Sequence, residues 1–295
     1  FGLLTVWGLF LLARKMFHPE KNRTRIALFA SFFLAVSFWH VNFSRIGFRA
    51  IMAPFFIVWG LYFFFRFYKD AGSSALQIIS AAVGGLFFGL GFHSYIAYRA
   101  APLLLLPLII SGWSKPRRET CFPCLVLIFM LFTAIAVMPL ALYFIDSPAD
   151  FFGRTSQISI FSSDSPLEAL SINVAKTIGM FWVYGDANWR HNLSGAPELN
   201  LAVGIFFLLG IILALKNLLF RGFPKFPKSN FGTDFGTDRF NGFFLLFWLG
   251  LMLLPVVVSS EGLPHALRAI ITIPPIMILS AYGFNWAIEK LAWRI

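Results

Sequence analysis

The sequence predicts an all-α polytopic membrane protein. Of its 295 residues, 58% are hydrophobic and only 13% are charged, and the mean hydropathy is +0.76. A soluble domain usually carries about twice that share of charged residues. The third observation is a series of long apolar runs, which are too uniform for helices that are buried on one side only. We therefore expect residues 1–295 to form one transmembrane helical bundle.

Nine membrane spans fit the apolar runs. A spanning helix needs about 20 mostly apolar residues, and most runs reach that length with their flanking residues. Four glycines, from Gly84 to Gly91, should allow one of these helices to pack closely against a neighbour. The spans cover about 1–13, 26–41, 47–65, 75–96, 101–113, 121–145, 199–216, 241–259 and 268–288.

Two of the nine spans are short. The run 1–13 starts without Met and inside an apolar stretch, so we interpret it as the end of a helix and the chain as a fragment of a longer protein. Pro102 and Pro107 interrupt 101–113, which predicts a short or broken helix that begins near Tyr95. Irregular backbone at membrane depth is tolerated where protein or a water-filled cavity covers it.

The basic residues predict the orientation. Nine spans place alternate connections on opposite sides, and one set of connections holds 17 of the 24 Lys and Arg residues. The positive-inside rule assigns this set to the cytoplasm, with 217–240 as a cytoplasmic linker loop. We expect a multi-pass protein of the cell (inner) membrane whose active face is extracytoplasmic. This asymmetry accounts for the net charge of +11, so we expect no nucleic-acid partner.

The longest predicted loop, 146–198, lies on the extracytoplasmic side. Ser165, Pro166 and Glu168 have the pattern of an N-cap, a proline at the first helical position and a capping-box glutamate. Apolar residues then follow at helical spacing. This predicts a helix over 166–182 that lies on the outer membrane interface.

The same side collects the candidate functional residues. Six of its seven cations are arginine, whose fixed fork of donors suits phosphate or carboxylate. Several arginines around one outward cavity would suit a phosphate or pyrophosphate at headgroup level. For any single arginine the alternative is a side chain that extends to lipid phosphate. The stretch GDANWRHNLSGAPEL at 185–199 adds an acid, an arginine and a histidine to this face.

Metal-ligand spacing is weak. The histidines show no HxxxH or HxxE pattern, so we predict no metal site, although a divalent metal cofactor is left open. The single pair Cys121 and Cys124 has no second pair, and we assign it no role.

Four stretches together resemble bacterial family-39-like glycosyltransferases of the GT-C fold, which include protein mannosyltransferases and the aminoarabinose transferase of lipid A. They are SRIGFR at 44–49, GLGFHSYIAYRAAP at 89–102, GDANWRHN at 185–192 and PHALR at 264–268.

The resemblance implies transfer of a sugar from a polyprenyl-phosphate carrier to a lipid, protein or glycan hydroxyl. It implies an acidic residue in the first outer loop that acts as general base. We expect that loop to lie upstream of Phe1, so we assign no catalytic base here. Asp186, His191 and His265 are our candidates for sugar or acceptor binding. The candidates for binding the donor phosphate are Arg45, Tyr95, Arg99, Arg190 and Arg268.

Other functions stay open. A transporter or flippase for lipid-linked or anionic substrates would carry ionisable residues near the middle of spans and paired broken helices. An O-antigen polymerase or ligase would also use outer-face arginines, on a lipid pyrophosphate. A non-catalytic membrane subunit is the third alternative.

Overall fold

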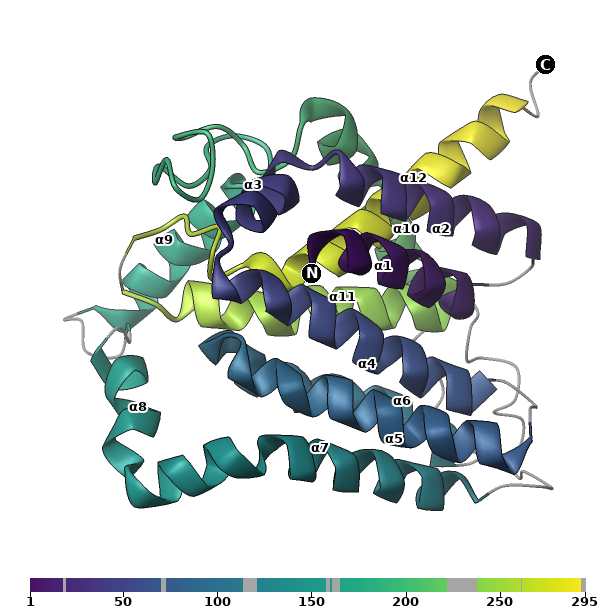
Figure 1. Cartoon of the computed structure of the whole chain (residues 1–295). Coiled ribbons are helices and arrows are strands. Elements are labelled where there is room, and N and C mark those ends of the chain that lie inside the picture. Colours follow the sequence, from purple (N-terminus) through teal and green to yellow (C-terminus); the bar gives the residue numbers. More distant parts are fainter. Residues whose placement is uncertain are drawn as a thin grey trace.

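The computed structural model is all-helical in the part of the chain that it describes (Figure 1). That part comprises residues 1–17, 20–69, 73–113, 121–157, 160, 165–221, 238–260 and 262–292. The α-helices are α1 (Gly2–Met16), α2 (Glu20–Ala35), α3 (Phe38–Ile46), α4 (Met52–Lys69), α5 (Ser74–Leu90), α6 (Leu105–Trp113), α7 (Phe122–Asp146), α8 (Pro148–Gln157), α9 (Pro166–Gly179), α10 (Leu201–Arg221), α11 (Asp238–Val257) and α12 (Ile273–Ala292). Short 3-10 segments are η1 (Arg49–Ile51), η2 (Gly91–His93), η3 (Ile96–Leu104) and η5 (Ile270–Thr272).

Seven helices are long and apolar enough to cross a membrane, or eight if one bent pair is counted as a single span. We predicted one straight span over 26–41. The structure has a bent pair instead: the helices Asn22–Ala35 and Phe38–Ile46 are bent by 55° relative to each other. Ser37 causes this break because its backbone is extended and its side chain accepts a hydrogen bond from His40 N, as an N-cap does. The predicted span 1–13 corresponds to α1, which has 15 residues and is shorter than the seven.

The short helix predicted to begin near Tyr95 is confirmed, and Ile96–Trp113 forms one continuous span rather than a broken one. Residues 96–104 form the 3-10 segment η3, with Pro102 inside it, and α6 continues in the same direction to Trp113. Proline has no N–H to donate, so it favours such a departure from α-helix. The irregular segment positions Tyr95 and Arg99 at one end of the bundle, where both border the cavity described below.

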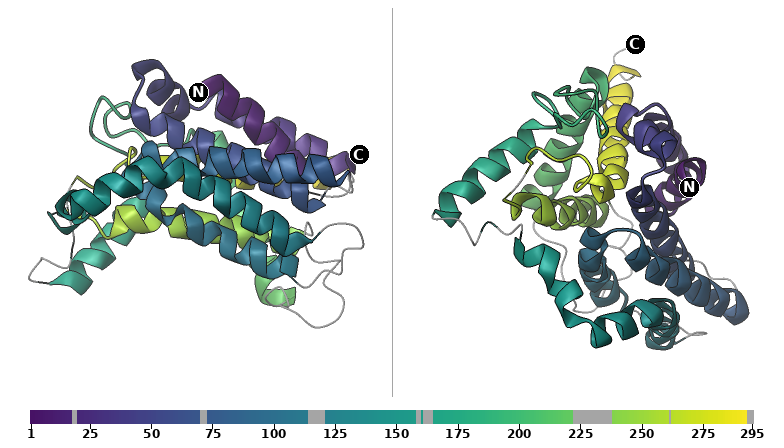
Figure 2. Two further views of the ribbon diagram at one scale, coloured as in Figure 1. Left: turned by 60° about the horizontal axis from the view of Figure 1, so that its bottom comes forward. Right: turned by 60° about the vertical axis from the view of Figure 1, so that its left-hand side comes forward.

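The helices pack side by side in the order α7, α5, α4, α1, α2, α12 and α10, and α11 contacts α10, α12 and η3 (Figure 2). The predicted close packing occurs between α5 and α7. A Cβ added to Gly85 would overlap the carbonyl oxygen of Phe129, and one added to Gly89 would lie 2.6 Å from that of Thr133. The Thr133 hydroxyl also donates to the Gly85 carbonyl at 3.1 Å. Glycine is therefore needed here for backbone contact between two apolar helices.

Connections predicted on opposite sides lie at opposite ends of the bundle (Figure 1). At one end, Lys69 Nζ donates to the carbonyls of Lys15 and Met16, at 2.5 and 2.9 Å. At the other end, Asn42 Nδ2 donates to the carbonyls of Arg190 and His191, both at 3.1 Å. Residues 222–237 of the predicted loop 217–240, and 158, 159 and 161–164 of the loop 146–198, lie outside the described residues.

The loop helix predicted over 166–182 is α9, which ends at Gly179. Ser165 precedes it and Pro166 opens it as expected, but the Ser165 side chain makes no capping hydrogen bond, so the predicted capping box is wrong. The helix is held instead by Asn173, which is buried and donates to the carbonyls of Val257 and Ser259, at 2.9 and 2.8 Å. These bonds attach α9 to the end of α11.

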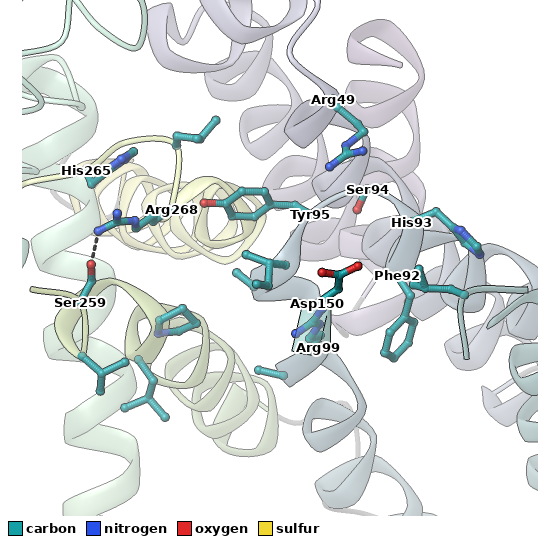
Figure 3. Close-up of a pocket in the computed structure, with 18 of the residues that line it drawn as sticks. Arg49, Phe92, His93, Ser94, Tyr95, Arg99, Asp150, Ser259, His265 and Arg268 are labelled. Carbon is teal, nitrogen blue, oxygen red and sulfur yellow. Dashed lines mark hydrogen bonds between the residues drawn. The ribbon is translucent and has the colours of Figure 1, made fainter. Parts of the chain in front are cut away.

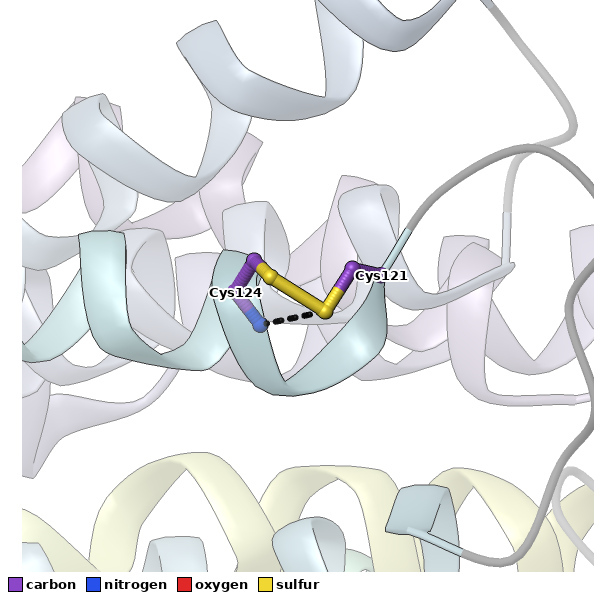
Figure 4. Close-up of a disulfide and its surroundings, with 2 residues drawn as sticks. All are labelled: Cys121 and Cys124. Carbon is purple, nitrogen blue, oxygen red and sulfur yellow. Dashed lines mark hydrogen bonds between the residues drawn. A yellow bond between two sulfur atoms is a disulfide. The ribbon is translucent and has the colours of Figure 1, made fainter.

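Cys121 and Cys124, to which we assigned no role, are joined by a disulfide at the start of α7 (Figure 4). Cys121 is the N-cap residue of that helix, and its sulfur accepts a hydrogen bond from Cys124 N at 3.3 Å.

The α5–α7 contact gives a stability prediction. Gly85→Ala should lower the free energy of unfolding by about 1–3 kcal/mol, because the new methyl group cannot be placed without separating two backbones. Thermal unfolding in detergent, followed by circular dichroism, measures this. Gly250→Ala in α11 is the matched control: its Cβ would meet no atom within 4 Å, so its stability should be unchanged or slightly higher. Equal effects of the two substitutions would contradict the proposed packing.

Candidate functional site

The predicted extracytoplasmic end contains a buried carboxylate that joins two loops. Asp186 Oδ1 accepts a hydrogen bond from Asn188 N at 2.8 Å. Its Oδ2 accepts from His191 Nδ1 at 2.8 Å and from Ala266 N at 2.9 Å. Asp186 is 5% exposed, so these bonds replace the water that it loses. They connect the loop 185–198 to the segment 262–268, which lies 80 residues away in sequence.

Two histidines lie on this carboxylate. The rings of His191 and His265 are stacked with centroids 5.1 Å apart, and His265 Nδ1 is 3.8 Å from Asp186 Oδ2. His191 also stacks on Phe43 of α3, at 5.7 Å, and meets the edge of Phe48, at 5.6 Å. Three segments distant in sequence therefore meet at the pair of Asp186 and His191: α3 with the residues after it, the loop 185–198 and the segment 262–268.

Burial and charge set the protonation of this group. Burial alone would raise the pKa of Asp186, but the hydrogen bonds from His191, Asn188 and Ala266 bring it below its ordinary value. Burial, together with the charge of Arg268, lowers the pKa of His265 to about 4, so its imidazole is neutral at pH 7. Asp186 is therefore ionised and His265 neutral under physiological conditions.

Glu198, at the end of the same loop, contacts the backbone of Asp186. Its Oε1 accepts a hydrogen bond from Asp186 N at 3.0 Å, and its side chain is buried. Burial raises the pKa of the Glu198 carboxyl to about 8 and the nearby charge of Asp186 adds to the rise, against hydrogen bonds from Asp186 N and Asn192. Glu198 is thus largely protonated at neutral pH, so that the two neighbouring carboxyl groups are not both charged.

A cavity of about 990 Å³ lies beside this group and extends between η2, η3, the ends of α7 and α11, and α8 (Figure 3). Its walls combine apolar and cationic side chains. Phe92, Leu140, Phe144, Leu254 and Pro255 are among the apolar ones. The charged and polar side chains are those of Arg49, His93, Ser94, Tyr95, Arg99, Asp150, Ser259, His265 and Arg268.

Two arginines are held in this wall by specific contacts. Arg99 donates to the carbonyl of Phe151 at 2.8 Å, and its guanidinium lies 4.9 Å from the ring centroid of Phe144 and 4.1 Å from that of Phe151. Arg268 donates to the hydroxyl of Ser259. In Figure 3 the hydroxyl of Tyr95 points toward Arg268. The guanidinium groups are therefore oriented before any ligand binds.

The structure divides the predicted donor-phosphate residues into two groups. Tyr95, Arg99 and Arg268 border the cavity. Arg45 and Arg190 are exposed and are not among its lining residues; the guanidinium of Arg190 lies 5.2 Å from the Phe48 ring centroid. Of the predicted sugar- or acceptor-binding residues, His265 lines the cavity, and Asp186 and His191 lie directly behind it.

Sequence reasoning gave no site role to four residues that the structure places here. Arg49 and Asp150 were visible as polar residues at the outer ends of spans. Ser259 and Glu198 had no such signal, because a serine after an apolar run and an acid at the end of a polar loop are both common on a surface. In the structure Ser259 is buried against Arg268, and Glu198 is buried against Asp186. This burial distinguishes them from ordinary surface residues, and it depends on the fold.

The protonation of Glu198 gives a pH prediction. The folded-state pKa of about 8 lies above the ordinary value of 4.5, so the stability contributed by protonated Glu198 is complete below pH 4.5 and is lost as the pH rises to about 8. Between these limits the free energy of unfolding should fall by about 1.4 kcal/mol per pH unit from this group.

Glu198→Gln cannot ionise and retains an acceptor for Asp186 N. Its stability should be close to that of the native chain at pH 5, where only a small part of the loss has occurred, and should exceed it at pH 8. Denaturation midpoints of both proteins from pH 5 to pH 9 measure the difference. A constant difference across this range would show that Glu198 does not titrate in the folded state.

Comparison with known proteins adds no assignment to this geometry. No protein-family model matches the chain, and no curated protein or solved structure matches it either. The resemblance to family-39-like glycosyltransferases stays a prediction.

Proposed function

We propose that the chain is part of a membrane glycosyltransferase that uses a polyprenyl-phosphate-linked sugar, with the cavity as the site of the lipid phosphate. The observation that carries the proposal is the combination of arginines and apolar side chains in one cavity at the end of a membrane-type bundle. A polyprenyl phosphate has the same combination, an anionic head on an apolar chain. Arg99 and Arg268 supply forked donors for the phosphate, and Phe92, Leu140 and Leu254 supply apolar contact.

The chemistry of transfer explains why fixed cations are useful. When a sugar leaves its carrier, negative charge develops on the phosphate oxygen, and donors that are already oriented stabilise it without reorganising. Contacts with Phe151 and Ser259 hold the two guanidinium groups in place beforehand. None of the present residues is given the role of the base that activates the acceptor hydroxyl.

The distribution of charge favours this proposal over a coupled transporter. Within the described residues of the candidate spans, every Asp, Glu, Lys and Arg lies close to one end of its span. Transporters usually carry binding groups near the middle of the membrane, on broken helices. The positive-inside rule further supports an extracytoplasmic position for the cavity, because the opposite end carries most of the basic residues.

Lipid binding tests the proposal directly. The chain is reconstituted in nanodiscs, and its affinity for undecaprenyl phosphate is compared with that for undecaprenol, which lacks the phosphate. Arg99→Gln and Arg268→Gln should each weaken binding of the phosphate by about 10- to 100-fold, since a hydrogen bond to a charged group contributes about 1.5–3 kcal/mol. Binding of undecaprenol should change little.

Arg45→Gln and Arg190→Gln are the matched controls, because they remove the same charge from the same end of the protein outside the cavity. They should leave the affinity within about twofold, as expected for exposed charges. Equal losses in all four variants, or equal affinity for the two lipids, would contradict the assigned phosphate site. Release of free carrier from undecaprenyl-phosphate-linked sugars then distinguishes transfer from movement of an intact carrier across the membrane.

A further inference from the structure

The cluster of Asp186, His191 and His265 has a feature that hydrogen bonding does not explain. His265 Nδ1 is buried and has no hydrogen-bond partner, although it lies 3.8 Å from Asp186 Oδ2. Buried polar nitrogens in folded proteins usually have a partner, so an unpartnered one indicates a missing ligand. The nitrogen faces the carboxylate oxygen that His191 also contacts, at 2.8 Å.

The three side chains offer ligand atoms at metal-site spacing. One such atom from each residue lies within 4.8 Å of the other two. In a tetrahedral zinc site the ligand atoms are about 2.0–2.2 Å from the ion, which places them about 3.3–3.5 Å apart. The distances of 2.8 and 3.8 Å from Asp186 Oδ2 lie on either side of this value. The ligand atoms of the two histidines lie within 4.8 Å of each other, so the side chains would have to move together around a bound ion.

We propose that Asp186, His191 and His265 bind a divalent transition-metal ion of the zinc class. Two imidazoles and one carboxylate are typical zinc ligands, whereas magnesium and calcium prefer sites made of oxygen ligands alone. Three protein ligands leave a fourth position for water or for a molecule in the cavity that His265 also lines. Because both loops contribute ligands, the ion would fasten 185–198 to 262–268.

The surroundings of the three ligands support this role. Asn188 N and Ala266 N donate to the two Asp186 oxygens and fix the carboxylate plane, as second-shell bonds do in metal sites. The Phe43 and Phe48 rings fix the His191 imidazole. Coordination would require His191 to carry its proton on Nε2, and the ion would then replace the hydrogen bond between His191 and Asp186. The inference does not rest on the proposed glycosyltransferase function.

Metal content and thermal stability test the site. The full chain is purified in detergent, treated with a chelator and titrated with ZnCl₂. Stoichiometric zinc should be retained after desalting. At a free concentration about 100 times the dissociation constant, zinc should raise the unfolding midpoint by about 5 °C. His265→Ala and His191→Ala should lose both the retained zinc and the shift.

His93→Ala is the matched control, because His93 borders the same cavity but bonds to the Ala136 carbonyl and lies outside the cluster. It should keep both responses. If the alanine variants do not fold, CoCl₂ added to the native chain gives an independent result, since tetrahedral cobalt has stronger visible absorption than hydrated cobalt. Absence of retained zinc and of this absorption, or retention of zinc by a folded His265→Ala variant, would overturn the proposal and leave the cluster as a hydrogen-bonded pair.

Discussion

The structure depends on the exclusion of charge from its apolar helices. A charged side chain in the middle of a membrane is expensive, and in the described spans Asp, Glu, Lys and Arg lie close to the two ends. The consequence is geometric. Connections that are far apart in sequence are brought to one end of the bundle, and their polar groups must find partners there. Asp186 and Ala266 are such partners, with 80 residues between them.

The burial of Asp186 shows how this end is stabilised. A carboxylate with so little exposure needs several hydrogen-bond donors. Asn188 N and His191 Nδ1 of its own loop supply two of them, and Ala266 N of the segment before η5 supplies the third. Glu198 and His265 are also buried, and their burial keeps the Glu198 carboxyl protonated and the His265 imidazole uncharged at neutral pH. One ionised group, one protonated acid and two histidines therefore form a compact polar unit behind the cavity, and the arginines remain in its wall.

The fold places the outer arginines in different surroundings. All these arginines are predicted on the outer side, yet Arg99 and Arg268 face the cavity whereas Arg45 and Arg190 are exposed. Exposed cations contribute mainly through long-range fields that salt screens, whereas cations in a cavity with apolar walls interact more strongly with a bound anion. A bound lipid phosphate should therefore depend on the first pair much more than on the second.

The sequence by itself determined the all-helical class with apolar helices long enough to cross a membrane, seven of the predicted spans, the start of the helix near Tyr95 and the two-ended distribution of charge. These features follow from local composition and hydropathy, which do not require knowledge of the fold. It failed at Ser37, where a local cap interrupts a continuous apolar run, and at Ser165, whose capping bond does not form. Only the tertiary structure decided which polar residues meet. Asp186, His191 and His265 have no motif spacing, and their proximity arises because chain reversal at the ends of helices brings two loops onto the same carboxylate.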